Sequence, residues 1–159
     1  MKASYPADII KQFLYIGVIL NWMKKYELTE HTADVGILAW GRDLKEAFAN
    51  AALGMLSVMV EPEEVVEKDV REVEVEAGDV ESLLVGWLNE LIYLFDVEHM
   101  IFKRFDIKEI EKDRIHALCY GEKIEPSRHH LKTGVKAATY HMLKVERNDL
   151  FRVRIILDI

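Results

Sequence analysis

Residues 70–95 read VREVEVEAGDVESLLVGWLNELIYLF, and their hydrophobic period changes halfway along. Val73, Val75 and Ala77 alternate with glutamates, which is the pattern of a β-strand with one face in solvent. After a Gly-Asp pair, apolar residues recur every three or four positions, as they do in a helix packed on a core. This apolar stripe consists of Val80, Leu83, Leu84, Trp87, Leu88, Leu91, Ile92 and Phe95. The stretch therefore predicts a half-buried strand followed by a long amphipathic helix.

The flanking sequence repeats both patterns. Residues 43–46 read DLKE, which resembles a capping box, and a second apolar stripe runs from Leu44 to Met59. Strand-like patterns cover residues 35–40, 70–77, 102–110, 114–120, 134–146 and 151–158. We therefore predict an α+β fold, a single-domain layered sandwich of mainly antiparallel or mixed β-sheet packed with two long amphipathic helices.

The composition excludes several classes of protein. Half of the residues are hydrophobic and 31% are charged, which suits a buried core with a solvated surface. The single cysteine, Cys119, cannot form an internal disulfide and fits a reducing compartment, so we expect a cytoplasmic protein. A net charge of −7 disfavours direct binding to nucleic acid, because that affinity comes mainly from Lys and Arg at phosphates. If the protein takes part in RNA chemistry, we therefore expect another protein to contact the RNA.

The first 22 residues differ from the rest of the chain. The longest apolar run, residues 13–20, is far shorter than the roughly 20 residues that span a bilayer. Met23, followed by two lysines, resembles a second translation start. We expect residues 1–22 to be an N-terminal extension that precedes a start at Met23, and residues 23–159 to form the domain. A helix lying on the domain and a membrane anchor are the alternative interpretations of the extension.

Potential ligands gather in residues 26–36, which read YELTEHTADVG. Glu30, His31 and Asp34 place three oxygen or nitrogen donors close together, and loops on a rigid scaffold often carry functional sites. From these residues alone, a local turn is the favoured interpretation, with Asp34 bonding nearby backbone amides and Gly36 relieving crowding. A ligand cluster is the alternative.

A second group of anionic ligands lies at residues 155–159, which read IILDI. In a strand, Asp158 projects away from the face of Leu157 and Ile159, so its neighbours can anchor in the core. The α-carboxylate of Ile159 would add another anionic group. Together with Asp34, these groups would make an all-oxygen set suited to Ca²⁺ or Mg²⁺. A solvated acidic terminus is the alternative, and it is the simpler one for these residues alone.

Basic and aromatic residues are frequent in residues 121–141. In a regular strand, His129 and His130 would point to opposite faces and could not both bind one metal ion. Lys136 and Tyr140 would share a face and present a basic, aromatic patch to a partner or a phosphate. An ordinary exposed β-face is the equal alternative. The sequence contains none of the GxGxxG, GxxxxGK[ST], GxSxG and HExxH motifs, so these residues alone identify no reaction.

Five motifs occur in the order of one known family. They are HTADVG at 31–36, LLVGWLNELIYLF at 83–95, GE at 121–122, LKTGVKAATYH at 131–141 and ILDI at 156–159. The chain resembles the archease family over residues 26–159. Archeases assist the tRNA-splicing RNA ligase, which joins 2′,3′-cyclic phosphate or 3′-phosphate ends to 5′-hydroxyl ends. The resemblance implies a non-enzymatic activator in tRNA splicing and processing that promotes ligase guanylylation and multiple turnover.

The resemblance also implies a metal site. Archeases commonly bind calcium through the Asp of the HTAD motif and the Asp-Ile terminus, which carries over to Asp34, Asp158 and Ile159. Mg²⁺ or Mn²⁺ are alternative ions. We expect His31, Glu90 and Lys136 to be further site or partner-facing residues. No catalytic residue, membrane contact or small-molecule substrate is expected, and RNA would be reached only through the ligase.

Three positions depart from the family pattern. Gly86 replaces a more polar residue, Gly134 replaces a common Glu, and Met142 replaces a small residue, so we assign no role to Gly134. The acidic charge of the chain fits docking on a basic, nucleotide-binding ligase. Two other functions remain as alternatives. One is a chaperone or modulator of RNA-modifying enzymes, and the other is a metal-dependent phosphohydrolase.

Overall fold

A computed structural model of the chain describes residues 6–30 and 32–159, apart from the side chains of residue 13 and residues 17–23. The described elements are α1 (Ala7–Met23), β1 (Tyr26–Glu30), β2 (Asp34–Gly41), α2 (Leu44–Met59), a 3₁₀ turn η1 (Pro62–Glu64), β3 (Asp69–Glu76), α3 (Val80–Asp96), β4 (Met100–Ile110), β5 (Arg114–Lys123), β6 (Ala137–Arg147) and β7 (Phe151–Asp158). The strands form two sheets, in the orders β1-β2-β7-β6 and β3-β5-β4. Every strand pairing in both sheets is antiparallel.

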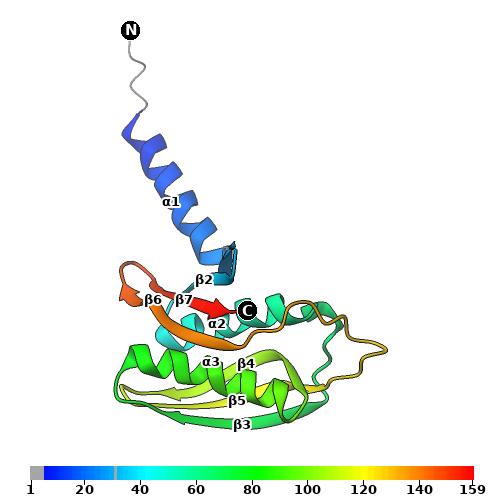
Figure 1. The fold of residues 1–159 in the computed structure, drawn as a ribbon. Helices are drawn as coiled ribbons and strands as arrows, with labels where there is room; N and C mark the ends of the chain where they lie inside the picture. Colours follow the sequence, from blue (N-terminus) through cyan, green and yellow to red (C-terminus); the bar gives the residue numbers. More distant parts are fainter. Residues whose placement is uncertain (1–5, 31) are drawn as a thin grey trace.

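The two sheets enclose the helices α2 and α3 (Figure 1). Helix α2 packs on β2 and β7 on one side and on β4 on the other, while α3 packs on β6 and β3. Because both sides of α2 are covered, it buries residues around most of its circumference. The prediction of an α+β layered sandwich with two long helices is therefore confirmed.

Both long helices begin at an aspartate that caps the first turn. The Asp43 carboxylate accepts a 2.8 Å hydrogen bond from the backbone N–H of Glu46, and Asp79 accepts one of 2.7 Å from Ser82. The hydrogen bond from Ser82 lowers the pKa of Asp79. Glu46 reaches back to the N–H of Arg42, at 2.7 Å, rather than to that of Asp43. The predicted helix starts are confirmed, with the reciprocal bond displaced by one residue.

Trp87 joins the layers at the centre of the molecule. Its side chain is fully buried, and its Nε1–H donates a 3.1 Å hydrogen bond to the carbonyl of Phe48 in α2. Its ring meets Phe105 of β4 edge to face, with 5.8 Å between the centroids. The predicted stripe of α3 is thus tied both to the second helix and to the three-stranded sheet.

Two strand predictions differ from the structure. Residues 26–30 form an additional edge strand, β1, paired with β2. The strand expected from residue 134 begins at Ala137, because the segment before it docks elsewhere: the N–H groups of Lys132 and Thr133 bond to the carbonyls of Met59 and Val58. Residues 125–136 are therefore a connection held on the end of α2 rather than part of a strand.

The N-terminal segment forms the helix α1, which points away from the sheets in Figure 1. Its Ile10, Leu14 and Tyr15 side chains are 53%, 65% and 68% exposed, so it does not pack on the domain through this face. No helix among the described residues is long and apolar enough to cross a membrane. That residues 1–22 precede a start at Met23 stays a prediction.

Candidate metal and partner site

Asp34 and Asp158 lie directly opposite each other where β2 begins and β7 ends. Side chains of directly opposed residues in antiparallel strands project from the same face of a sheet. The folding pattern thus brings together two carboxylates that are far apart in the sequence. Like charges in this arrangement repel each other, at a cost of roughly 0.2–1 kcal/mol.

The Oδ1 atom of Asp34 is buried and accepts no hydrogen bond within the described part of the chain. A buried acceptor without a partner costs about 1–3 kcal/mol, so native proteins rarely keep one without a reason. The interpretation of Asp34 as a turn residue bonding local amides does not account for this oxygen. An oxygen without a donor, beside a second carboxylate, fits a hard cation better than it fits an empty surface.

Ile159 follows Asp158 and packs against the hydrophobic core. This contact anchors the end of β7, and a main-chain oxygen of Ile159 would add to the oxygen donors of the two aspartates. The donor set is therefore oxygen only, which is the preference of Ca²⁺, Mg²⁺ and Mn²⁺. The residues Asp34, Asp158 and Ile159 fit such an ion on this chemistry.

Gly36 allows β1 to approach β2 closely beside the aspartate pair. A Cβ atom at this position would lie 2.2 Å from Oγ1 of Thr29 and 3.2 Å from Cδ1 of Ile156. Only glycine fits between these neighbours without displacing one of them. The interpretation of Gly36 as a residue that relieves crowding is confirmed.

The other predicted site residues have different positions. The backbone N–H of Lys136 donates a 2.8 Å hydrogen bond to the carbonyl of Asp158, so Lys136 lies at the site, with its side chain exposed. Glu90 is half-buried in α3, and its neighbour Asn89 contacts β6. His31 lies outside the described residues, so its predicted role stays a prediction. The roles of Lys136 and Glu90 toward a partner also stay predictions.

Asn89 makes a contact that the sequence does not reveal. Its Oδ1 accepts a 2.8 Å hydrogen bond from the N–H of Ala138, and its Nδ2 donates one of 3.3 Å to the same residue's carbonyl. Ala138 lies in the edge strand β6, so the amide of Asn89 takes the place of a neighbouring strand. Asn89 therefore supports the free edge of β6. It positions β6 next to Asp158, which faces Ala137 in the register.

We expect Asn89→Ala to lower the free energy of unfolding by about 1–3 kcal/mol, because it leaves two backbone groups of β6 without partners. Hydrogen exchange should show faster exchange of the Ala138 amide in the variant than in the wild type. Glu90→Ala is the control and should change stability by less than about 0.5 kcal/mol. Equal protection of the Ala138 amide in wild type and Asn89→Ala would contradict this role of the side chain.

A buried polar cluster holds the connection that leads to the site. Glu122 is 1% exposed and accepts hydrogen bonds from both terminal nitrogens of Arg128, at 3.0 and 2.5 Å, and from the N–H of Val66 at 2.8 Å. The hydrogen bonds from Arg128 hold the pKa of Glu122 well below its ordinary value, against the opposing effect of burial. The cluster thereby fastens residues 125–130 to the segment after η1.

His129 completes this cluster from inside the protein. Its Nδ1 accepts a 2.8 Å hydrogen bond from the N–H of Glu125, so its Nε2 carries the proton and donates to Glu122 at 2.9 Å. His130 is exposed, and its N–H bonds to Glu64 at 2.6 Å. His129 is buried and His130 is exposed, but both lie in the connection between β5 and β6 and not in the strand that the prediction assumed. The hydrogen bonds of both residues indicate that they stabilise the fold.

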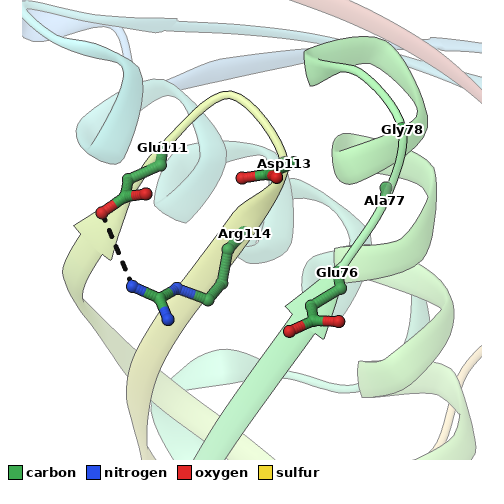
Figure 2. Close-up of a pocket in the computed structure, with 6 residues that line it drawn as sticks. All are labelled: Glu76, Ala77, Gly78, Glu111, Asp113 and Arg114. Carbon is green, nitrogen blue, oxygen red and sulfur yellow. Dashed lines mark ion pairs between the residues drawn. The ribbon is translucent and has the colours of Figure 1, made fainter.

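Other groupings of charge lie away from the aspartate pair. An open depression of about 570 Å³, lined by Glu76, Ala77, Gly78, Glu111, Asp113 and Arg114, lies at the ends of β3 and β5 (Figure 2). Glu72, Glu74 and His116 approach one another on β3 and β5, where His116 has a partner that the sequence did not reveal: its Nε2 lies 2.6 Å from Oε1 of Glu72. None of the predicted site residues belongs to either grouping.

The fold agrees with comparisons with known proteins. A model of the archease protein family matches residues 26–159. The chain belongs to the archease family. The match begins at the first residue of β1, after α1, and covers the two sheets with both enclosed helices.

Archeases of two archaea are similar to this family member over most of their length. The archease of Methanosarcina mazei is 43% identical over 141 residues, which cover 86% of this chain and 97% of the relative. That of Pyrococcus abyssi is 46% identical over 129 residues, which cover 79% and 90% of the two chains. The resemblance seen in the five motifs is therefore confirmed at the level of the family.

Two solved structures are also similar. A solution structure of a Methanobacterium thermoautotrophicum protein has a TM-score of 0.73 and 36% identity, covering 84% of this chain and 98% of its own. A crystal structure from Thermotoga maritima, described as an archease and possible chaperone, has a TM-score of 0.57 and 24% identity, covering 84% and 96%. The second likeness supports the archease fold alone.

Proposed function

We propose that this archease is a protein activator of the GTP-dependent tRNA-splicing RNA ligase, promoting its guanylylation and its multiple turnover. The observation that carries the proposal is the buried Oδ1 of Asp34, which lacks a hydrogen-bond donor and lies across from Asp158. Such a pair is costly for folding and is therefore better explained by a function than by stability. Membership of the archease family supports the choice of partner.

The aspartate pair is proposed to hold a divalent cation, with Ca²⁺ as the expected ion and Mg²⁺ or Mn²⁺ as alternatives. Asp34, Asp158 and a main-chain oxygen of Ile159 would be its protein ligands. A bound cation would supply positive charge that offsets the repulsion of the two carboxylates and orders the ends of β2 and β7. Lys136, whose N–H bonds to Asp158, is proposed to face the partner beside this site.

The activator requires no nucleophile of its own. If it binds the conformation of the ligase that accepts GMP more tightly than other conformations, it raises the population of that conformation by mass action. A net charge of −7 favours encounter with the basic, nucleotide-binding surface expected of such a ligase. The joined RNA is then contacted only by the ligase, and the pair is proposed to act in the cytoplasm.

RNA joining under multiple turnover tests the proposal. The ligase of the same organism should complete many rounds of joining with the wild-type protein, and a single round or fewer with Asp34→Ala or Asp158→Ala. Asp149→Ala is the matched control, because Asp149 is an exposed aspartate in the turn between β6 and β7, and it should stimulate like the wild type. Full stimulation by a folded Asp34→Ala/Asp158→Ala variant would contradict the proposal.

The chaperone function is the second candidate, favoured by the description of the Thermotoga maritima relative. It predicts suppression of aggregation of unrelated client proteins. That activity should be the same for the wild type and Asp34→Ala, since it does not use the carboxylate pair. Light scattering of a heated client protein separates the two functions.

A further inference from the structure

The edge strand β6 contains an unusually large bulge close to the aspartate pair. Thr139 lies opposite Ile156, and the next paired residue, Lys144, lies opposite Arg154. Residues 140–143 of β6 therefore face the single residue Ile155 of β7. Bulges occur often beside functional sites, where they redirect side chains.

One residue of this bulge has a strained backbone. Met142 has a φ angle of 54°, in the left-handed region that large side chains avoid. His99 is the other described non-glycine residue with positive φ, but it lies in the turn between α3 and β4, where such angles are common. The Nε–H of Arg154 donates a 2.8 Å hydrogen bond to the carbonyl of Met142 and holds the strained turn in place. Backbone strain of this kind, held in place by surrounding contacts, occurs most often at functional sites.

The bulge carries two large side chains that are exposed to solvent. Tyr140 is 63% exposed and Met142 is 54% exposed, while Leu143 turns inward and packs against the core. An edge strand can be protected from wrong pairing by a bulge or a charge alone, without large apolar residues. Tyr and Met are, in contrast, enriched where proteins bind each other. We call the exposed surface of Tyr140, His141 and Met142 the bulge patch.

The bulge patch is continuous with the site of the proposed function. Ala137 lies opposite Asp158, and Tyr140 follows three residues later. At a rise of about 3.3 Å per residue, these positions are roughly 10 Å apart along β6. The two are thus close enough along β6 for one protein surface to cover both.

We infer that the bulge patch is the apolar anchor by which this protein docks on the ligase, in a pocket of apolar side chains beside a basic rim. The inference rests on the proposed function for the identity of the partner. The net charge of −7 favours a basic rim on the partner, and the uncharged bulge patch favours an apolar pocket. Binding energy in such interfaces is concentrated in a few exposed aromatic or flexible apolar residues.

Substitutions at Met142 separate docking from folding. Asparagine and glycine both adopt the left-handed conformation more easily than methionine. Met142→Asn and Met142→Gly should therefore keep the bulge and a thermal midpoint at or above that of the wild type. Both should nevertheless weaken the affinity for the ligase at least tenfold, as should Tyr140→Ala. Val70→Ala, which changes an apolar side chain of similar exposure (53%) on β3 in the other sheet, is the control and should bind like the wild type.

Titration of ligase guanylylation with each full-length variant completes the test. For Met142→Asn we expect a half-saturating concentration at least ten times higher, with an unchanged maximum rate. Asp34→Ala should instead abolish the increase in the maximum rate of guanylylation. A failure of the proposed function is therefore distinguishable from a failure of this inference. An unchanged half-saturating concentration for both Met142 variants and Tyr140→Ala would overturn the docking role. So would sedimentation showing that the patch joins two copies of this chain.

Discussion

Replacing Asp34 by asparagine should stabilise the metal-free protein and abolish its stabilisation by calcium. In EDTA, the variant loses the repulsion between two opposed carboxylates, and its amide gains a donor that can reach Asp158. We expect the free energy of unfolding to rise by about 1 kcal/mol in EDTA. With free Ca²⁺ at roughly one hundred times Kd, the wild type should gain about 2.7 kcal/mol and the variant almost nothing.

Urea unfolding in EDTA and in Ca²⁺ measures these free energies. The variant should be more stable than the wild type in EDTA, and the wild type should be more stable than the variant in Ca²⁺. Asp149→Asn serves as the control, since it removes an exposed aspartate outside the site and should respond to Ca²⁺ like the wild type. The account of Asp34 is wrong if Asp34→Asn destabilises the protein in EDTA. It is also wrong if the variant and the wild type gain equal stability from calcium.

Glu122→Gln should lower the free energy of unfolding by about 3 kcal/mol at pH 7, the second large effect that we expect. The substitution removes the charge that Arg128 neutralises inside the cluster, and Arg128 is left with the single carboxylate of Glu125. A fully buried pair would lose up to about 5 kcal/mol, but the Arg128 side chain is 35% exposed, which reduces the effect. Glu125→Gln removes the exposed partner of the same arginine and should cost less than about 1 kcal/mol.

The effect of Glu122 should depend on pH in a defined direction. Because its pKa in the folded protein lies below the ordinary value of 4.5, the carboxylate contributes its full stability above that value. The contribution is lost as the pH falls from there toward the folded pKa. The difference between the wild type and Glu122→Gln should therefore narrow below about pH 4. Unfolding curves at pH 7, 5 and 3 check this, and a constant difference would contradict the ion-pair role.

The local patterns of the sequence predict most of the fold. Alternation at Val73 and Val75 and the stripe around Trp87 need only the geometry of one strand and one helix, so they are visible without a structure. The strand β1 is short and lies at an edge with mostly exposed side chains, so it carries no clear alternation. The bulge at Met142 also escapes prediction, because it exists only in the register between β6 and β7.

The site is less accessible to sequence reasoning than the fold. Residue types offer Asp34 and Asp158 as one oxygen-ligand set, and the family resemblance favours it, but their direct opposition depends on the pairing of β2 with β7. The missing hydrogen bond at Asp34 and the double contact of Asn89 are properties of the packed structure. Residue types alone favour a turn at Asp34, because an aspartate near a glycine is more often a turn residue than a ligand.

Single-turnover guanylylation of the cognate ligase, with GTP and Mn²⁺, tests the central claim most directly. The ligase should accumulate its GMP adduct faster with the wild-type protein than alone, and Asp34→Ala should remove the acceleration while remaining folded by circular dichroism. An active ligase whose rate of guanylylation is the same with and without the folded wild-type protein would contradict the claim.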